Sequence, residues 1–192
     1  MDSVKNMTTR KPAATEVGTG FLSDVKTLRD RARQHIELGA VTPSYAGDKV
    51  TILRLLNEAL ATELVCVLRY RRHYFCAEGA VAESVKKEFM EHAVEEQEHA
   101  DEIAKRIVEL GGAPDFSPKG LDTRSHSEYK AGNSLKDMAK EDLIAERIAI
   151  ESYTEMIAYI GDKDPTTKRM LAAILAKEEE HAEDMSSIYK HL

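Results

Sequence analysis

The sequence predicts an all-α protein built around a bundle of four long helices. Four stretches of about 26 to 30 residues carry apolar residues at helical spacing, and turn-forming residues separate them. No stretch of useful length alternates between apolar and polar residues, as a half-buried strand would. In addition, the pattern of the first two helices recurs in the last two. Together these observations predict one helical domain made of two similar hairpins.

Composition narrows the class of protein. The 192 residues are 42% hydrophobic and 32% charged, which predicts one globular domain with a sizeable core. No apolar run approaches the roughly 20 residues of a membrane-spanning helix, and the first twenty residues lack the apolar block of a secretory signal. We therefore expect a cytoplasmic protein with no membrane partner. The formal net charge of −7 argues against a broad basic surface, so nucleic acid is not expected as a partner.

The N-terminal part of the chain precedes the bundle. Residues 1–20 are polar and rich in threonine, so we expect a flexible tail. Residues 21–47 predict an extra amphipathic helix, from about Phe21 to Leu38, and then a linker with turn-forming residues. Residues 48–192 are expected to form the four-helix bundle domain.

The first hairpin is predicted directly after this linker. Its first helix runs from about Lys49 to Ala77, with Asp48 as the expected N-cap. Its second helix runs from about Val81 to Leu110 and ends before two glycines. Because the connection is short, the two helices are expected to be antiparallel.

The second hairpin has similar dimensions. Its first helix begins after Ser134, where Ser-x-x-Asp resembles a capping box, and ends at Gly161. Its second helix begins at Pro165, with Asp164 as N-cap, and runs nearly to the C-terminus. A short turn again predicts an antiparallel pair.

A long connection joins the two hairpins. The stretch from Gly112 to Asn133 contains two prolines and three glycines, and we expect one helical turn near Ser125 to Tyr129. A connection of this length can return along the bundle. It therefore predicts that the second and third long helices run parallel.

Each hairpin carries the same set of metal-binding side chains. A lone glutamate in its first helix is followed 33 or 32 residues later by Glu-x-x-His in its second helix. The six residues are Glu63, Glu96, His99, Glu146, Glu178 and His181. Each glutamate lies 13 to 15 residues from the nearest turn, so all four are expected at one height in the bundle. Spacing i, i+3 places each histidine on the same helix face as its glutamate.

Four carboxylates at one height in a core require positive charge. Both lone glutamates lie on apolar stripes, and buried carboxylates repel one another and lose hydration. Two divalent ions balance four negative charges, and oxygen and imidazole ligands favour iron or manganese. We expect Glu96 and Glu178 to bridge the two ions, with one histidine on each ion. Glu63 and Glu146 are expected to be terminal ligands.

A few neighbouring residues have open roles. Tyr70 and Tyr153 lie seven residues beyond the lone glutamates, where a hydroxyl could bond a ligand or pass an electron. Tyr70 is thus a further catalytic candidate, although both rings could simply pack in the core. Cys66 and Cys76 are about 15 Å apart on one helix, too far for a disulfide, and a redox role for either stays open. His92 lies seven residues before a predicted ligand and is a weaker candidate.

These residues resemble the ferritin-like superfamily, and in particular bacterioferritin and its relatives that are similar to DNA-protecting proteins. The resemblance covers about Asp48 to Tyr189 and rests on the two lone glutamates and the two Glu-x-x-His motifs. It implies a ferroxidase in which two iron ions per subunit are oxidised from Fe(II) to Fe(III) by dioxygen or hydrogen peroxide. It also implies that iron is stored or detoxified inside a hollow homo-oligomeric cage of twelve or twenty-four subunits.

The sequence departs from bacterioferritin in three places. The position of that family's haem-ligating methionine is Gln97 here, so haem is not expected. The long crossover and the extra N-terminal helix are similar to features of smaller shells, so the number of subunits stays open.

Glu91 and Glu95 match positions that line the inner surface in bacterioferritin, which is a weaker correspondence.

Two other functions remain compatible with the sequence. The same ligands could serve a di-iron oxygenase or peroxidase that acts on another substrate. A rubrerythrin-like peroxidase would carry a Cys-x-x-Cys iron module, which this sequence lacks, whereas a hydroxylase would need a substrate pocket. A shell that only coats DNA is the third possibility, and the acidic net charge argues against it.

Overall fold

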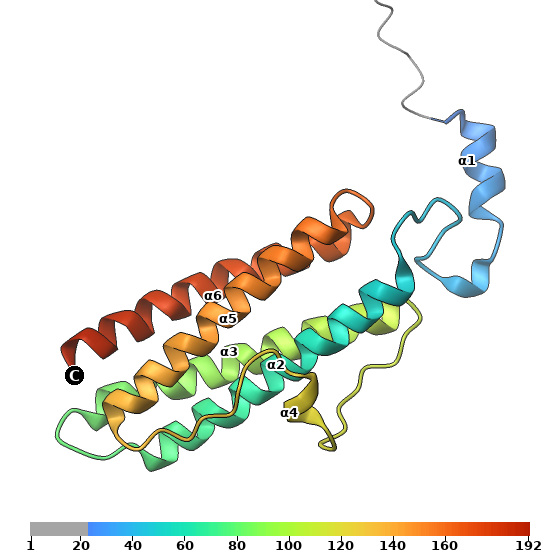
Figure 1. Ribbon diagram of the computed structural model, residues 1–192. Coiled ribbons are helices and arrows are strands. Elements are labelled where there is room, and N and C mark those ends of the chain that lie inside the picture. The colour runs from blue at the N-terminus through green and yellow to red at the C-terminus, as the bar shows by residue number, and fades with distance from the viewer. Residues whose placement is uncertain (1–22) are drawn as a thin grey trace, which may run out of the picture.

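Two antiparallel helical hairpins form the bundle (Figure 1). The computed structural model describes residues 23–192. The first hairpin consists of α2 (Lys49–Cys76) and α3 (Ala82–Glu109), and the second of α5 (Leu135–Ile160) and α6 (Pro165–His191). Every regular element in the described part of the chain is helical, which confirms the predicted all-α bundle. None of these helices has the length and hydrophobicity that crossing a bilayer would require.

Local sequence explains where the long helices begin. The side chains of Asp48, Ser134 and Asp164 each accept a hydrogen bond from the backbone amide three residues later. These bonds satisfy amides that have no partner within the first helical turn. Pro165 opens α6, where its missing amide hydrogen costs nothing. The predicted bounds of the four helices agree with the structure to within about one residue.

The core consists of two apolar clusters with a polar layer between them. One cluster includes Leu56, Leu60, Ile103, Ile107, Leu171 and Ile174. The other includes Tyr70, Phe89, Met138 and Met185. On each long helix, the glutamate predicted as a ligand lies between the residues of these two clusters. The apolar layers above and below therefore exclude water from the four carboxyl groups.

The crossover between α3 and α5 returns along the bundle, as predicted (Figure 1). Its one helical turn is α4, which spans Leu121–Arg124, so the predicted position near Ser125 to Tyr129 is wrong. Gly120 has φ of 70° and provides the left-handed backbone from which this turn starts. Arg124 closes the turn with hydrogen bonds to the carbonyls of Lys119 and Ser117, both at 2.9 Å.

A buried ionic network attaches the end of the crossover to the bundle. Asp142 of α5 accepts hydrogen bonds from Arg69 Nε and from His73 Nδ1, both at 2.8 Å, and all three side chains are fully buried. Arg69 also donates to Ser127 Oγ at 3.2 Å, and His73 Nε2 lies 3.1 Å from the carbonyl of Ala131. Two side chains of α2 thus hold both α5 and the crossover.

The N-terminal segment differs from the prediction. Instead of one helix from Phe21 to Leu38, the structure has α1 (Val25–Ala32) and a separate 3₁₀ turn, η1 (Ile36–Leu38). His35 between them has φ of 52°, a left-handed conformation that breaks the helix. No residue of either element is buried, and α1 lies away from the bundle (Figure 1). The predicted tail, 1–20, lies outside the described residues.

Candidate metal centre

All six predicted ligands lie together in the polar layer of the bundle. Each long helix contributes at least one of them. The glutamates meet at one height because they lie at similar distances from the two short turns. No side chain of the set is more than slightly accessible, with relative exposures of 0 to 7%. The residues are Glu63 of α2, Glu96 and His99 of α3, Glu146 of α5, and Glu178 and His181 of α6.

The ligand atoms form two groups of four, and two glutamates belong to both. In each group, one atom from every residue lies within 4.8 Å of the others. The first group is Glu63, Glu96, His99 and Glu178. The second group is Glu96, Glu146, Glu178 and His181. This division gives each group three carboxylates and one imidazole, with the Glu-x-x-His glutamates shared.

The shared carboxylates each turn one oxygen toward each histidine. His99 Nδ1 lies 3.4 Å from Oε2 of Glu96 and 2.9 Å from Oε1 of Glu178. His181 Nδ1 lies 3.7 Å from the other Glu96 oxygen, Oε1, and 3.9 Å from the other Glu178 oxygen, Oε2. A carboxylate placed in this way can bridge two metal ions, one per oxygen. The bridging role of Glu96 and Glu178 stays a prediction from the sequence.

The centre is also where buried polar atoms lack hydrogen-bond partners. Among the described residues, eight buried side-chain nitrogen and oxygen atoms have no partner, and seven of these belong to the six candidate ligands. They include Nδ1 of both histidines and at least one oxygen of every glutamate in the set. Buried polar groups are almost always satisfied in native proteins. Two cations would satisfy all seven atoms together.

Two tyrosines bond the lone glutamates of the opposite hairpins. The Tyr70 hydroxyl of α2 donates to Oε1 of Glu146 on α5, and the Tyr153 hydroxyl of α5 donates to Oε1 of Glu63 on α2. Both rings are buried. Each bond fixes one carboxylate oxygen and leaves Oε2 of Glu63 and of Glu146 free for another partner. The tyrosines therefore lie beside the candidate ligands and orient them.

Burial strongly affects the protonation of three glutamates. Desolvation, followed by repulsion from Glu96, raises the pKa of Glu63 to about 8 and that of Glu146 to about 7. The same two causes raise the pKa of Glu178 well above its ordinary value. Without metal, these carboxyl groups therefore bind protons near neutral pH.

The pKa of Glu96 is lowered, whereas the pKa values of the two histidines are raised. Burial would raise the pKa of Glu96, but contacts with His181 and His99 outweigh it and hold this pKa below its usual range. Burial would lower the pKa values of the imidazoles, but Glu63 and Glu96 raise that of His99 to about 10. Glu96 likewise raises the pKa of His181 to about 9. In the metal-free centre, protons thus supply the positive charge that cations would bring.

The donor set fits two divalent cations. It offers only carboxylate oxygens and imidazole nitrogens, which suit iron or manganese, and it contains no thiolate. Cys66 is buried nearby, and its burial raises the pKa of its thiol, so the sulfur stays protonated. Both cysteines are free, as the spacing on α2 predicts.

Sequence reasoning gave only weaker roles to two side chains that the structure places around the centre. Glu95 of α3 accepts a hydrogen bond from Nε2 of His181 at 2.7 Å and so orients that imidazole. His92 is buried, stacks on His181 with ring centroids 4.0 Å apart, and lies 3.1 Å from the Tyr70 hydroxyl. Both lie within four residues of Glu96 on α3. Their closeness to Glu96 in the sequence was the one indication of a role. The sequence does not show which way a polar side chain points when its helix face carries both polar and apolar residues.

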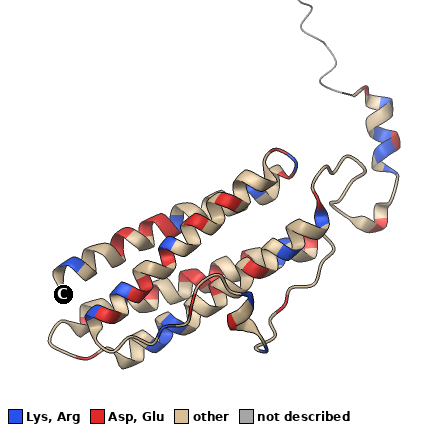
Figure 2. Ribbon diagram, viewed as in Figure 1, with Lys and Arg blue, Asp and Glu red and all other residues tan. Residues whose placement is uncertain are grey.

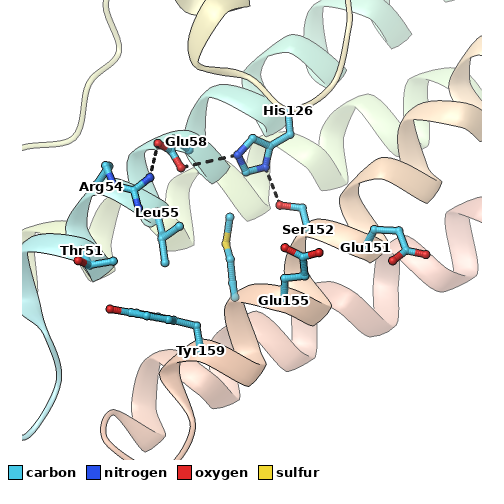
Figure 3. Close-up of a pocket in the computed structure, with 10 residues that line it drawn as sticks. Thr51, Arg54, Leu55, Glu58, His126, Glu151, Ser152, Glu155 and Tyr159 are labelled. Carbon is cyan, nitrogen blue, oxygen red and sulfur yellow. Dashed lines mark hydrogen bonds and ion pairs between the residues drawn. The ribbon is translucent and has the colours of Figure 1, made fainter.

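A separate surface cavity lies between α2 and α5 and contains none of the six residues. It has a volume of about 480 Å³ and is lined by Glu58, His126 and Ser152, among others (Figure 3). His126 Nδ1 lies 2.6 Å from Ser152 Oγ, which resembles part of a hydrolytic triad. However, Glu58 is 3.7 Å from His126 Nε2, too far for a hydrogen bond, and is paired with Arg54 at 2.7 Å. The group therefore lacks the hydrogen-bonded carboxylate that completes such a triad.

Comparisons with known proteins agree with this fold. The family described as Ferritin-like domain matches residues 53–192. A bacterioferritin from Desulfovibrio desulfuricans is 26% identical over 149 residues, which cover 75% of this chain and 77% of that protein. A nutrient stress-induced DNA-binding protein from a Nostoc species is 33% identical over 132 residues, which cover 66% of this chain and 71% of that protein.

A solved structure of a bacterioferritin-related protein is similar to this chain in both sequence and fold. The bacterioferritin-related protein from Bacteroides fragilis, described as a dodecameric thioferritin, is 33% identical to this chain and superposes with a TM-score of 0.73. The superposition covers 76% of this chain and 88% of that one. The family match covers all of the four long helices except the first turn of α2, and it includes every residue of the centre; the chain belongs to the ferritin-like family.

Proposed function

We propose that this protein is a ferroxidase that oxidises Fe(II) with dioxygen or hydrogen peroxide and stores or detoxifies the iron in a hollow cage of its own copies. The observation that carries this proposal is the pair of buried ligand groups that share Glu96 and Glu178. Two Fe(II) ions held side by side can together supply two electrons. Those two electrons, with two protons, reduce dioxygen to hydrogen peroxide or hydrogen peroxide to water.

Each side chain has a distinct role in this proposal. Glu63 and His99 bind one iron ion, and Glu146 and His181 bind the other. The two shared glutamates hold both ions at a short, fixed separation. Because Glu63 and Glu146 carry protons near neutral pH when no metal is bound, binding of Fe(II) displaces those protons.

Tyr70 and Tyr153 are positioning residues in this scheme. Each holds one oxygen of a terminal glutamate by a hydrogen bond from its hydroxyl. Their pKa values lie well above the ordinary value because of burial and the neighbouring carboxylates, so both hydroxyls keep their protons. This arrangement fixes which oxygen of Glu63 and of Glu146 is presented to iron.

The proposed cage is supported by relatives. The relative from Bacteroides fragilis is described as dodecameric. Family members include proteins named bacterioferritin and a stress-induced protein named for DNA binding. We propose a homo-oligomer of twelve or twenty-four copies. With a net charge of −7, the chain is expected not to bind nucleic acid.

Anaerobic loading followed by oxidation tests the proposed function. Fe(II) is added without oxygen, and ferric absorbance is then followed after dioxygen or hydrogen peroxide is admitted. We expect fast oxidation of two Fe(II) per chain, and its loss in the Glu96→Ala, Glu178→Ala double variant. The matched control is Glu98→Ala with Glu179→Ala, which removes two exposed glutamates from the same helices.

Two results would count against the proposal. Unchanged fast oxidation in the Glu96→Ala, Glu178→Ala variant would remove these residues from the reaction. Absence of fast iron oxidation in the unaltered protein, with two ions bound, would favour an oxygenase or peroxidase acting on another substrate.

A further inference from the structure

A third group of potential ligands lies outside the two groups of the centre. Glu88 and His92 of α3 and Asp184 of α6 each offer an atom within 4.8 Å of the others. They line a surface cavity of about 530 Å³ between α3 and α6, and six of its lining residues are Asp or Glu. Acidic residues recur along α6 (Figure 2). His92 is 2% exposed, whereas Asp184 is exposed, so the group spans the boundary between core and surface.

Hydrogen bonding determines which nitrogen of His92 carries the proton. The Tyr70 hydroxyl has one proton, and it donates that proton to Glu146. At 3.1 Å from His92 Nδ1, the same hydroxyl oxygen must then accept a hydrogen bond from that nitrogen. A neutral imidazole has a single N–H, so Nε2 of His92 is left with a lone pair.

That lone pair points toward the acidic cavity without a donor. Among residues 23–192, no side chain or backbone group forms a hydrogen bond to His92 Nε2, and the nearest charged group is Asp184 Oδ2 at 3.6 Å. A carboxylate has no proton to give to a lone pair. Two acceptors that face each other in this way, one of them on a nearly buried side chain, are both satisfied by a cation between them.

A neighbouring combination can be set aside on the same reasoning. His92, Glu95 and His181 also have atoms within 4.8 Å of one another. However, Nε2 of His181 donates to Glu95 at 2.7 Å, while its Nδ1 faces the shared glutamates. His181 therefore has no nitrogen left for another ion. The group with Glu88 and Asp184 does not need it.

We propose that Glu88, His92 and Asp184 bind a third divalent first-row transition-metal ion, such as Fe(II) or Mn(II), at the surface end of the polar layer. One imidazole and two carboxylates give three protein ligands and two negative charges, which match one divalent ion. The open cavity leaves room for water to complete the coordination. The site goes beyond the proposed ferroxidase activity, because it shares no ligand with the two groups at the centre.

Anomalous diffraction tests this site in the full-length protein. Crystals are soaked with Mn(II), and we expect three peaks per chain, the third within bonding distance of His92 Nε2. The Glu88→Gln, Asp184→Asn double variant should lose the third peak and keep the other two. Glu91→Gln is the matched control, because Glu91 lines the same cavity but is paired with Lys87 at 3.1 Å. It should keep all three peaks.

Electron paramagnetic resonance of free Mn(II) gives the same count in solution, with about three ions bound per chain falling to two in the double variant. His92→Gln should have the same effect. If that buried substitution prevents folding, the two surface substitutions still decide the question. The proposal is overturned if Mn(II) fills the centre without a third peak, or if that peak persists in the double variant. A third peak with an empty centre would refute the proposed function alone.

Discussion

At the scale of single residues, the most informative contacts are the crossed bonds between tyrosines and glutamates. The sequence places Tyr70 and Tyr153 seven residues beyond Glu63 and Glu146 on the same helices, but each hydroxyl bonds the glutamate of the other hairpin. Seven residues span about 10 Å along a helix. A tyrosine can reach across the bundle more easily than back along its own helix, which explains the exchange.

Removing one of these hydroxyls should weaken the centre without abolishing it. For Tyr70→Phe and Tyr153→Phe, we expect affinity for Fe(II) or the rate of its oxidation to fall about 10- to 100-fold, as is usual when a partner of a metal ligand is lost. Anaerobic titration and stopped-flow absorbance measure the two quantities. Tyr159→Phe, on the surface of α5, should behave like the unaltered protein. Equal losses in all three variants would contradict a positioning role.

Competition between protons and metal ions should make binding depend on pH. The pKa values of about 7 for Glu146 and about 8 for Glu63 require that both lose protons when metal binds. Each proton released changes apparent affinity about tenfold per pH unit. We therefore expect Mn(II) to bind at least about tenfold more tightly at pH 8 than at pH 6, as measured by isothermal titration calorimetry in two buffers. Affinity that does not change with pH would contradict these protonation states.

The six candidate ligands could be found from sequence alone because the duplication repeats their spacing and the turns fix their height. His92 and Glu95 could be named only as weaker candidates, because a single copy of a polar residue on a helix gives no measure of its orientation. Asp142 lies four residues before Glu146 and shares its face, which hints at burial. Its partners, Arg69 and His73, are on another helix, and only packing brings them together.

At the scale of the elements, the long helices follow from local signals, whereas the N-terminal segment does not. Asp48, Ser134 and Asp164 cap the helices that the apolar periodicity predicts. The predicted helix from Phe21 to Leu38 had a comparable stripe, but the structure leaves Val25 and Ile36 60% and 76% exposed. A short helix gains most of its stability from packing. Because no residue of α1 or η1 is buried among the described residues, this segment forms only one eight-residue helix and one turn.

The buried network of Asp142 should be needed for stability. Replacing Asp142 with Ala leaves Arg69 buried without its carboxylate partner. Breaking a buried ion pair in this way costs about 3–5 kcal/mol, and we expect the free energy of unfolding to fall by that amount. Urea denaturation followed by circular dichroism measures the change. Glu155→Ala, an exposed position on the same helix, should change it by less than about 0.5 kcal/mol. A similar small effect for Asp142→Ala would show that the network contributes little.

At the scale of the whole molecule, the stability of the metal-free bundle should depend on pH. The raised pKa values of His99, about 10, and His181, about 9, stabilise the fold below pH 6.5 and lose that effect as pH rises through them. Glu63, whose pKa is raised from 4.5 to about 8, also makes the fold less stable as pH rises between those two values. Glu96, whose pKa is depressed, stabilises the fold above its ordinary pKa of 4.5 and loses that contribution as pH falls below it.

We therefore expect the metal-free protein to be most stable near pH 5 and to lose at least about 5 °C of Tm between pH 6 and pH 9. Saturating Mn(II) should remove this loss, because cations replace the protons. Differential scanning calorimetry after treatment with a chelator measures both curves. A Tm that rises over this range without metal would show that the buried carboxyl groups are not protonated there.

The size of the assembly can be predicted from the proposed cage. Twelve copies of the 21.5 kDa chain give about 260 kDa, and twenty-four give about 520 kDa. Light scattering coupled to size exclusion should find one of these masses. A monomer or dimer would contradict the cage and favour an oxygenase.

Neither hairpin holds a complete ion position on its own, because each group borrows one carboxylate from the other half: Glu178 for the first and Glu96 for the second. The exchange is reciprocal, like the contacts across a two-fold axis. Two copies of a single ancestral hairpin, paired face to face, would already possess the whole centre. Gene duplication and the crossover would then have tethered an assembly that metal had first held together.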